Sequence, residues 1–162
     1  MAAIANHGVL VSASSWHRDR VVLGMVAAVA ERGYAATTIT DVVRHARVSR
    51  RTFYEHFADK ETCFLAAYDA VSDSVLAGMA EAAGRAGARE DEILASVRAY
   101  LEALAAEPAV ARVFIVDILG AGPAALARRR EVLRRFAAHI QARIRQPRDE
   151  RRPEAPDEPD DR

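Results

Sequence analysis

The residues of this 162-residue chain whose types and spacing could do chemistry lie between positions 50 and 56. They are Arg50, Arg51, Thr52, Tyr54 and His56. Arginine can donate two parallel hydrogen bonds to the edge of a guanine, whereas threonine and tyrosine suit a thymine methyl group or phosphate oxygens. On the outer face of one helix, this set would offer a DNA groove both positive charge and hydrogen-bond donors.

Two short helices joined by a tight turn are predicted to position this group. Thr38 and Asp41 have the spacing of a capping box, in which hydroxyl and carboxylate satisfy the free amides at a helix start. A helix from about Ile39 to His45 follows, with its apolar residues at helical spacing. Residues 46–48 leave room only for a sharp reversal of the chain.

A second helix is predicted after the turn, because Ser49 is a suitable N-cap. Phe53 and Phe57 lie one turn apart and give this helix a buried edge, so the polar residues between them face outward. Thr38 and Thr40 begin the preceding helix, where free backbone amides favour an anion such as phosphate.

Lys60, the only lysine of the chain, begins the next predicted helix and is a candidate for holding the DNA backbone. Each of these polar residues also has a structural interpretation, because a serine can simply cap and two adjacent arginines usually form a solvated face. The interpretation as a DNA-reading unit depends on their occurring together, directly after a capped short helix and a tight turn.

Residues 17–68 resemble the N-terminal DNA-binding domain of the TetR family of one-component transcriptional regulators. The motifs that carry the resemblance are Glu31-Arg32-Gly33-Tyr34, Thr37-Thr38-Ile39, Val48-Ser49, Thr52-Phe53-Tyr54-x-His56-Phe57 and Lys60-Glu61. The resemblance implies an all-α protein with a three-helix helix-turn-helix head and a helical effector-binding and dimerisation body. It also implies a homodimer that represses from a double-stranded DNA operator and is released by an unknown small-molecule effector.

Carried over by position, the resemblance assigns DNA contacts to nine residues. They are Thr38, Thr40, Ser49, Arg50, Arg51, Thr52, Tyr54, His56 and Lys60. One departure concerns the turn, where Arg47 stands at a position that is usually glycine in the family. Glycine accepts a positive φ without strain, so Arg47 is expected to cost stability if the same backbone is kept.

Four segments are predicted along the chain. Residues 1–14 are expected to form a flexible arm, 15–75 the head with its motif at 38–57, 76–145 the body, and 146–162 a disordered tail that holds four of the six prolines. The predicted body helices run from about Asp59 to Ala83, Glu90 to Ala106, Pro108 to Leu119 and Ala124 to Arg145.

An effector pocket is expected among these body helices. Its candidate lining residues, chosen for size or for a polar tip on an apolar surface, are Tyr68, Met79, Tyr100, Phe114, Asp117 and Phe136. The alternative is that they only fill the core. Asp117 lies within an apolar helix and needs a partner, which could be Arg112, an arginine of the last helix or a ligand.

The charge distribution and the cysteine content limit the range of possible functions. The chain has no net charge, but residues 17–60 carry eight basic against five acidic side chains, which suits attraction to phosphate. Cys63 is the single cysteine and is interpreted as a small buried residue.

No catalytic motif, cofactor-binding motif or metal-ligand spacing is recognised, and no run is judged long enough to cross a membrane. We therefore expect a cytoplasmic DNA-binding protein, with no enzymatic activity, cofactor or membrane partner.

Members of the resembled family usually continue for two more long helices that form the dimer interface. Either the helices at 109–119 and 124–145 take over dimerisation, or self-association is weakened. The alternative function is a shortened helical interaction protein that pairs with another regulator. The basic cluster at 128–135 is interpreted as a solvated face offset by acidic neighbours, the alternatives being a nucleic-acid, membrane or subunit contact.

Overall fold

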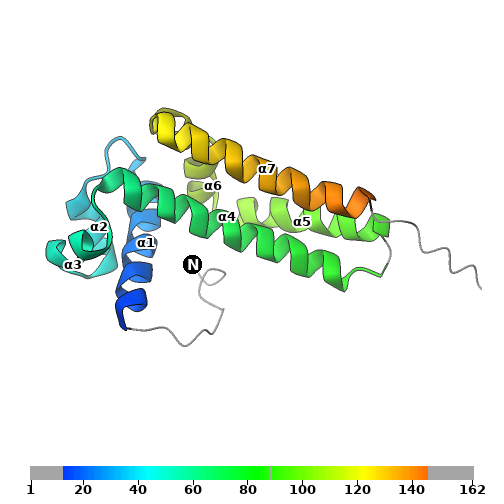
Figure 1. Ribbon diagram of the computed structural model, residues 1–162, viewed down its shortest axis with the longest axis horizontal. Helices are drawn as coiled ribbons and strands as arrows, with labels where there is room; N and C mark the ends of the chain where they lie inside the picture. Colours follow the sequence, from blue (N-terminus) through cyan, green and yellow to red (C-terminus); the bar gives the residue numbers. More distant parts are fainter. Residues whose placement is uncertain (1–12, 88, 146–162) are drawn as a thin grey trace, which may run out of the picture.

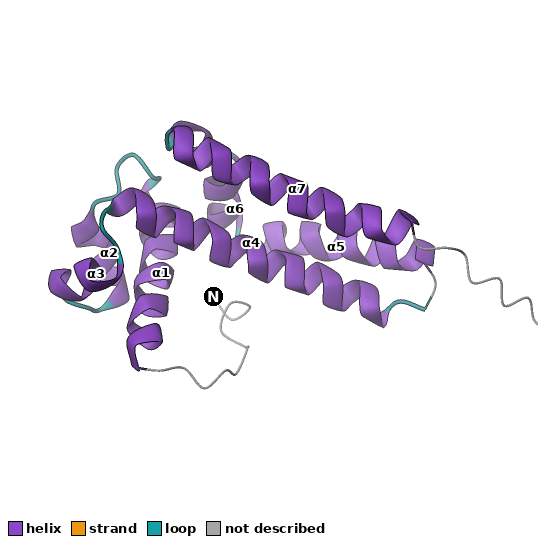
Figure 2. Ribbon diagram, in the orientation of Figure 1, coloured by secondary structure: helices purple, strands orange, loops and turns teal. Residues whose placement is uncertain are grey.

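The computed structural model describes residues 13–87 and 89–145, which form helices joined by short turns (Figures 1 and 2). The elements are α1 (Ala13–Arg32), α2 (Ile39–Ala46), α3 (Arg50–His56), α4 (Lys60–Arg85), α5 (Arg89–Ala106), α6 (Pro108–Ile115), the 3-10 helix η2 (Asp117–Gly120) and α7 (Pro123–Arg145). The all-α prediction is confirmed. The predicted tail at 146–162 and all but the last two residues of the predicted arm lie outside the described residues.

Helices α1, α2 and α3 gather at one end of the molecule and form the head (Figure 1). Helix α4 starts at the head and runs the length of the body beside α5 and α7. It passes without a break through residue 75, where the head is predicted to end. Movement of α4 in the body would therefore be transmitted directly to the head.

The head is built around apolar residues that are almost completely inaccessible to solvent. They are Val21, Met25 and Val29 of α1, Val42 of α2, Phe53 of α3, and Cys63 and Phe64 of α4. Burial raises the pKa of the Cys63 thiol to about 12, against a smaller opposing effect of Arg18. The thiol stays protonated near neutral pH and serves as a small apolar group, as the sequence indicates.

Helices α1 and α2 approach each other most closely at Gly24. A Cβ atom added there would lie 2.7 Å from both the Ala46 Cβ and the Val42 carbonyl oxygen, and 2.8 Å from the Ala46 amide nitrogen. These distances are shorter than van der Waals contact, and two of the three neighbouring atoms belong to the backbone. Glycine is therefore required here by the helix–helix contact, which sets the position of α2 on α1.

The predicted capping box at the start of α2 is present. The Thr38 hydroxyl accepts a hydrogen bond from the Asp41 amide at 3.3 Å, and the Thr38 amide donates to Asp41 Oδ2 at 3.0 Å. The Thr38 hydroxyl also donates to Asp41 Oδ2 at 2.7 Å, and this bond is the main cause that holds the pKa of Asp41 below its usual value. Arg32 reaches the same carboxylate at 3.2 Å, joining the end of α1 to α2.

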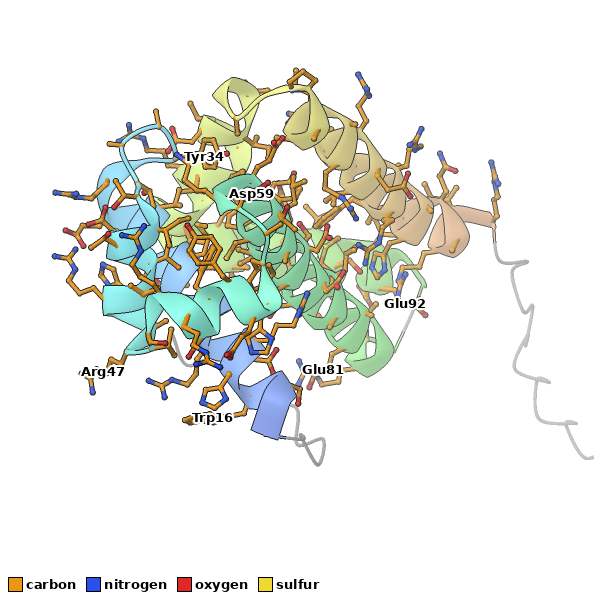
Figure 3. The ribbon with its side chains drawn as sticks, turned by 60° about the vertical axis from the view of Figure 1, so that its left-hand side comes forward. Trp16, Tyr34, Arg47, Asp59, Glu81 and Glu92 are labelled. Atoms are coloured by element: carbon orange, nitrogen blue, oxygen red, sulfur yellow. The ribbon has the colours of Figure 1, made fainter. Side chains whose placement is uncertain are left out.

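The turn between α2 and α3 contains the strained position expected from the sequence. Arg47 has φ 53° and ψ 47°, the left-handed conformation, and is the one non-glycine residue with positive φ among the described residues. The Arg20 guanidinium donates to the carbonyls of Ala46 at 2.6 Å and Arg47 at 3.0 Å, so a side chain of α1 holds the turn in place. The Arg47 side chain itself points into solvent (Figure 3).

Replacement of Arg47 by glycine is expected to stabilise the protein by about 0.5–1 kcal/mol, because glycine lacks the Cβ clash but loses more entropy on folding. The free energy of unfolding in urea measures the effect. Arg47→Ala removes the same side chain but keeps the Cβ, so it should leave stability nearly unchanged. Equal stability of the glycine and alanine variants would show that the turn is not strained.

Helix α4 is long and apolar enough, by length and composition, to cross a membrane, so the expectation that no run reaches that length is wrong. In the fold this helix packs against α1, α5 and α7. It buries Phe64, Tyr68 and Met79 among other residues. A helix at the centre of a helical body needs the same apolar character, which accounts for the composition of α4.

The segment predicted as one helix from Pro108 to Leu119 is divided in two. Helix α6 ends at Ile115, and η2 begins at Asp117. Ile118 of η2 is fully buried, and Ala121 just after it is buried as well. The change from α-helix to 3-10 helix rotates these residues toward the core. Their burial depends on packing against distant helices, which the apolar spacing within residues 108–119 does not reveal.

A buried polar network joins three helices of the body. Ser96 of α5 is completely buried and donates to the Met79 carbonyl of α4 at 3.2 Å, while its hydroxyl lies 3.3 Å from Nε2 of His139 on α7. Arg143 donates to the His139 carbonyl at 2.8 Å. Burial lowers the pKa of His139, and the Arg143 charge lowers it further. The imidazole is therefore neutral near pH 7 and serves as a structural link.

Candidate nucleic-acid interface and ligand cavity

Helix α3 begins at the predicted N-cap. The Ser49 hydroxyl accepts a hydrogen bond from the Thr52 amide at 3.0 Å and lies 2.9 Å from the Thr52 hydroxyl. Both hydroxyls are thus partly used within the helix start. Val48, just before the cap, packs against the head core together with Phe53, as expected for a hydrophobic staple.

Helix α3 presents two different faces. Phe53 and Phe57 are buried, with their ring centroids 5.9 Å apart, and fix the helix to the head. Arg50, Arg51 and Tyr54 are exposed on the opposite side. The structure thus brings together the three side chains with the greatest capacity for contact with base edges and phosphates, on a helix that is rigidly held.

One acidic residue on α3 offsets part of this positive charge. Glu55 Oε1 lies 3.1 Å from Arg51 Nε, one turn earlier on the helix. The Arg51 side chain is 90% exposed, and exposed pairs of this kind contribute only about 0.3–0.5 kcal/mol. Arg51 can therefore leave Glu55 for a phosphate at little cost.

The other candidate DNA contacts surround α3 but differ in availability. Thr40 is exposed, whereas the Thr38 hydroxyl is used in the capping box. Lys60 donates to the carbonyls of Tyr34 at 3.0 Å and of Thr37 at 3.1 Å, and so closes the loop between α1 and α2. His56 is half-buried in a groove between the head and α4. Contact of these four residues with DNA stays a prediction.

Two arginines of α1 that the sequence motifs did not indicate also lie close to the candidate interface. Arg18 lies over the Phe57 ring at 5.3 Å, and Arg20 holds the turn and lies over the Trp16 ring at 4.6 Å. Both are far from α3 in the sequence. The sequence around them carries no distinguishing signal, because both lie in the polar run His17-Arg18-Asp19-Arg20, and only the fold brings Arg20 to the turn.

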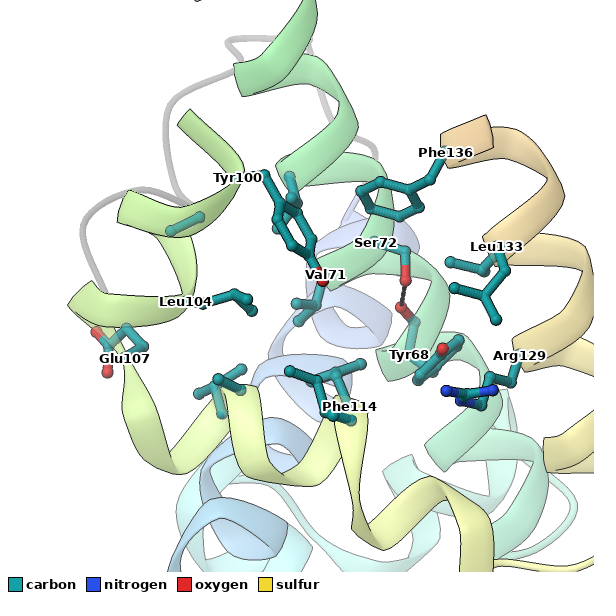
Figure 4. Close-up of a pocket in the computed structure, with 16 residues that line it drawn as sticks. Tyr68, Val71, Ser72, Tyr100, Leu104, Glu107, Phe114, Arg129, Leu133 and Phe136 are labelled. Atoms are coloured by element: carbon teal, nitrogen blue, oxygen red, sulfur yellow. Dashed lines mark hydrogen bonds between the residues drawn. The ribbon is translucent and has the colours of Figure 1, made fainter. Parts of the chain in front are cut away.

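The body contains an apolar cavity of about 180 Å³ (Figure 4). It is lined by Tyr68, Val71, Ser72, Val75, Tyr100, Ala103, Leu104, Glu107, Val110, Ala111, Phe114, Ile115, Arg129, Val132, Leu133 and Phe136. Its aromatic walls form two pairs, with ring centroids 4.9 Å apart for Tyr68 and Phe114 and 5.6 Å apart for Tyr100 and Phe136. These four residues were predicted from the sequence; their contact with a ligand stays a prediction.

The structure places the other two candidate ligand residues away from this cavity. Met79 is buried at the position where its carbonyl accepts the Ser96 hydrogen bond. Asp117 lies near the head, where its Oδ1 is 4.0 Å from Arg112 Nε, one of the partners expected for it. Residue type alone could not separate these two from the lining residues, because helix rotation decides which side chain faces the cavity.

The cavity has several polar groups among its apolar walls. The Ser72 hydroxyl donates to the Tyr68 carbonyl at 2.8 Å. Burial raises the pKa of Tyr68, although the Arg129 charge opposes this effect, so its hydroxyl remains a neutral donor near pH 7. Arg129 lies beside Tyr68 on one side of the cavity and Glu107 lies on the other (Figure 4).

Most arginines of the basic cluster on α7 are paired with acidic residues, as the interpretation of a solvated face predicts. Arg128 lies 3.0 Å from Asp69, Arg135 pairs with Asp73, and Arg134 lies 2.6 Å from Glu131. The first two pairs join α7 to α4. Arg129, which that interpretation grouped with the others, instead lines the cavity.

Comparison with known proteins agrees with this arrangement. The family model described as "Bacterial regulatory proteins, tetR family" matches residues 26–67. The fatty acid degradation regulator FadR from Bacillus halodurans is 19% identical with a TM-score of 0.72, and the match covers 79% of this chain and 66% of that one. A bacterial regulatory protein in the tetR family from Rhodococcus RHA1 is 25% identical with a TM-score of 0.66, covering 79% and 67%.

A third structure, the transcriptional regulator FadR from Bacillus subtilis in complex with stearoyl-CoA, is 16% identical with a TM-score of 0.70. The match covers 78% of this chain and 68% of that one. The chain thus spans about two thirds of the length of these proteins. No curated protein matches its sequence.

Proposed function

Because the chain belongs to the TetR family of bacterial regulatory proteins, we propose that it is a cytoplasmic repressor that binds its operator as a homodimer and leaves it when a small molecule enters the body. It is a binding protein and not an enzyme. The observation that carries the proposal is the division of α3 into a buried edge, Phe53 and Phe57, and an exposed face with Arg50, Arg51 and Tyr54.

Recognition of DNA follows from the exposed face of α3. Arg50 and Arg51 lie in the first turn, the part of a recognition helix that meets base edges in the major groove. Tyr54 lies one turn further along and suits a phosphate. The Arg20 contacts to the turn and the buried Phe53 hold α3 rigidly, which lowers the entropic cost of binding.

The position of α6 supports release by a ligand. This helix contributes Phe114 to the cavity wall, packs against α1 of the head and buries the adjacent Val113. A ligand that moves Phe114 away from Tyr68 would shift α6 against α1 and change the orientation of α3. The complex of the Bacillus subtilis regulator with stearoyl-CoA supports a ligand role for a body of this fold.

Dimerisation is supported by exposed apolar side chains on the body. Leu94, Val97 and Leu101 recur along one face of α5 and are 57%, 40% and 57% exposed. Further exposed apolar residues are Ile115, Val116, Leu119, Leu126, Leu133 and Ile144. An exposed apolar stripe like that of α5 is typical of a protein–protein interface. A twofold dimer would place two copies of α3 on two half-sites of the operator.

The proposal can be tested with the purified protein and a labelled DNA fragment from upstream of its own gene. We expect a dimer mass in sedimentation experiments and sequence-selective binding in fluorescence anisotropy, with an affinity that falls as salt rises. A scrambled fragment of equal length is the control. A monomer that binds both fragments equally would contradict the proposal and favour the alternative of an interaction protein that pairs with another regulator.

A further inference from the structure

Arg129 differs from Arg128, Arg134 and Arg135 of α7 in having no acidic partner, and from the exposed Arg130 in lining a cavity. Arg128, Arg134 and Arg135 each form an ion pair, whereas no acceptor lies within hydrogen-bond or ion-pair distance of Arg129 among the described residues. Its side chain is half-buried and lines the apolar cavity. A guanidinium held at an apolar surface without a counter-ion has lost hydration that only an anion would restore.

The Tyr68 hydroxyl adds a second donor at the same place. Tyr68 is 4% exposed, and its ring is stacked on Phe114 at a centroid distance of 4.9 Å, so its position is fixed. No hydrogen bond from its hydroxyl is found among the residues that the structure describes. Figure 4 shows the ring beside Arg129. A carboxylate could therefore accept from both the guanidinium and the phenol.

We propose that the cavity binds a small amphiphilic carboxylic acid, with its carboxylate at Arg129 and Tyr68 and its apolar part between the two aromatic pairs. The proposal rests on the ligand role of the body and specifies the chemical class of the ligand. The carboxylate replaces the missing counter-ion, which explains why one arginine of a paired cluster faces an apolar cavity.

Charge at the opposite side of the cavity fixes the orientation of the ligand. Glu107 lies across the cavity from Arg129 (Figure 4). A carboxylate near Glu107 would be repelled, so the anionic end is directed to Arg129 and the apolar end toward Leu104 and Tyr100. A ligand amine would be repelled by Arg129 and would have to lie in the reverse orientation, toward Glu107, whose exposed carboxylate is screened by solvent.

The size of the cavity limits the ligand. At about 180 Å³ it is slightly larger than the roughly 150 Å³ apolar cavity that holds benzene, so it suits a short ligand and not a long one without rearrangement. Octanoate is a short ligand of this kind and is a suitable probe. A long acyl chain or an acyl-CoA would require the helices of the body to separate.

The test compares octanoate, octylamine and 1-octanol, which share the same chain and differ in the charge of the head group. Binding to the full chain is measured by isothermal titration calorimetry. We expect octanoate to bind most tightly, and Arg129→Met to weaken it by about 10- to 100-fold while leaving 1-octanol unaffected. Tyr68→Phe keeps the stacked ring and should weaken octanoate by about 3- to 10-fold.

Arg130→Met is the matched control, because Arg130 is exposed and does not line the cavity. Equal affinity for octylamine and octanoate, or octanoate binding unchanged by Arg129→Met, would overturn the proposal. Anisotropy of labelled operator DNA separates this result from the proposed function. Binding of octanoate without release of DNA supports the ligand class and contradicts ligand-controlled repression, whereas DNA binding without any octanoate binding overturns only the ligand class.

Discussion

Alanine at Arg50 or Tyr54 is expected to lower the affinity for operator DNA by about 10- to 100-fold without changing the thermal midpoint of unfolding. Both side chains are exposed on α3, whereas the core contacts of this helix come from Phe53 and Phe57. Truncation therefore removes hydrogen-bond donors and leaves Phe53 and Phe57 in place, although Tyr54→Ala also removes the edge contact of its ring with Phe53, at a centroid distance of 5.4 Å. In a dimer each substitution acts twice, which places the effect toward the upper part of that range.

Comparison of the operator with a scrambled fragment distinguishes the two roles. Loss of Arg50 from a base edge should reduce discrimination between the operator and a scrambled fragment, whereas loss of Tyr54 from a phosphate should weaken binding to both. Arg130→Ala removes an equally exposed arginine from the body and should leave the affinity unchanged. If Arg50→Ala and Tyr54→Ala bind like the parent protein, α3 is not the recognition helix.

Alanine at Gly24 is expected to destabilise the protein by roughly 1–3 kcal/mol, although alanine favours helices over glycine. The added Cβ would lie 2.7 Å from the Val42 carbonyl oxygen and 2.8 Å from the Ala46 amide nitrogen, and backbone atoms cannot move aside as side chains can. Helix α2 would be displaced from α1. Because α3 follows α2 by a short turn, operator affinity should fall as well.

Gly78→Ala is the matched control for Gly24→Ala. Gly78 lies within α4, and nothing lies within 4 Å of a Cβ added there. Its replacement should stabilise the protein by up to about 1 kcal/mol through helix propensity alone. Urea unfolding followed by circular dichroism measures both variants. A stabilised Gly24→Ala variant would contradict the close approach of α1 and α2.

The α2–turn–α3 unit of the head could be predicted from the sequence, because its signals are local. The capping box of Thr38 and Asp41, the cap at Ser49 and the spacing of Phe53 and Phe57 each depend on residues within one or two turns. These features also predict which side chains of α3 are exposed. Arg47 was expected to be strained because the resembled family usually has glycine at this position, and its φ of 53° lies in the left-handed region that favours glycine.

The cavity could be predicted only in part, because it is made by residues that are distant in the sequence. Tyr68, Tyr100, Phe114 and Phe136 were predicted from their size, and all four line it. Arg129 was grouped with its charged neighbours. Its sequence neighbourhood is uniformly basic, so nothing local distinguishes the one arginine that faces the cavity.

The sequence by itself determined the short helices α2 and α3, their caps and the two faces of α3, since hydrogen bonds and apolar periodicity within a helix involve residues three or four positions apart. The tertiary structure decided the approach of α1 and α2 at Gly24, the Arg20 contacts to the turn and the position of Arg129 at the cavity. Each of these depends on how helices are rotated and placed against one another. That arrangement minimises the free energy of the whole core, so the rotation and placement of a helix cannot be predicted from a short segment alone.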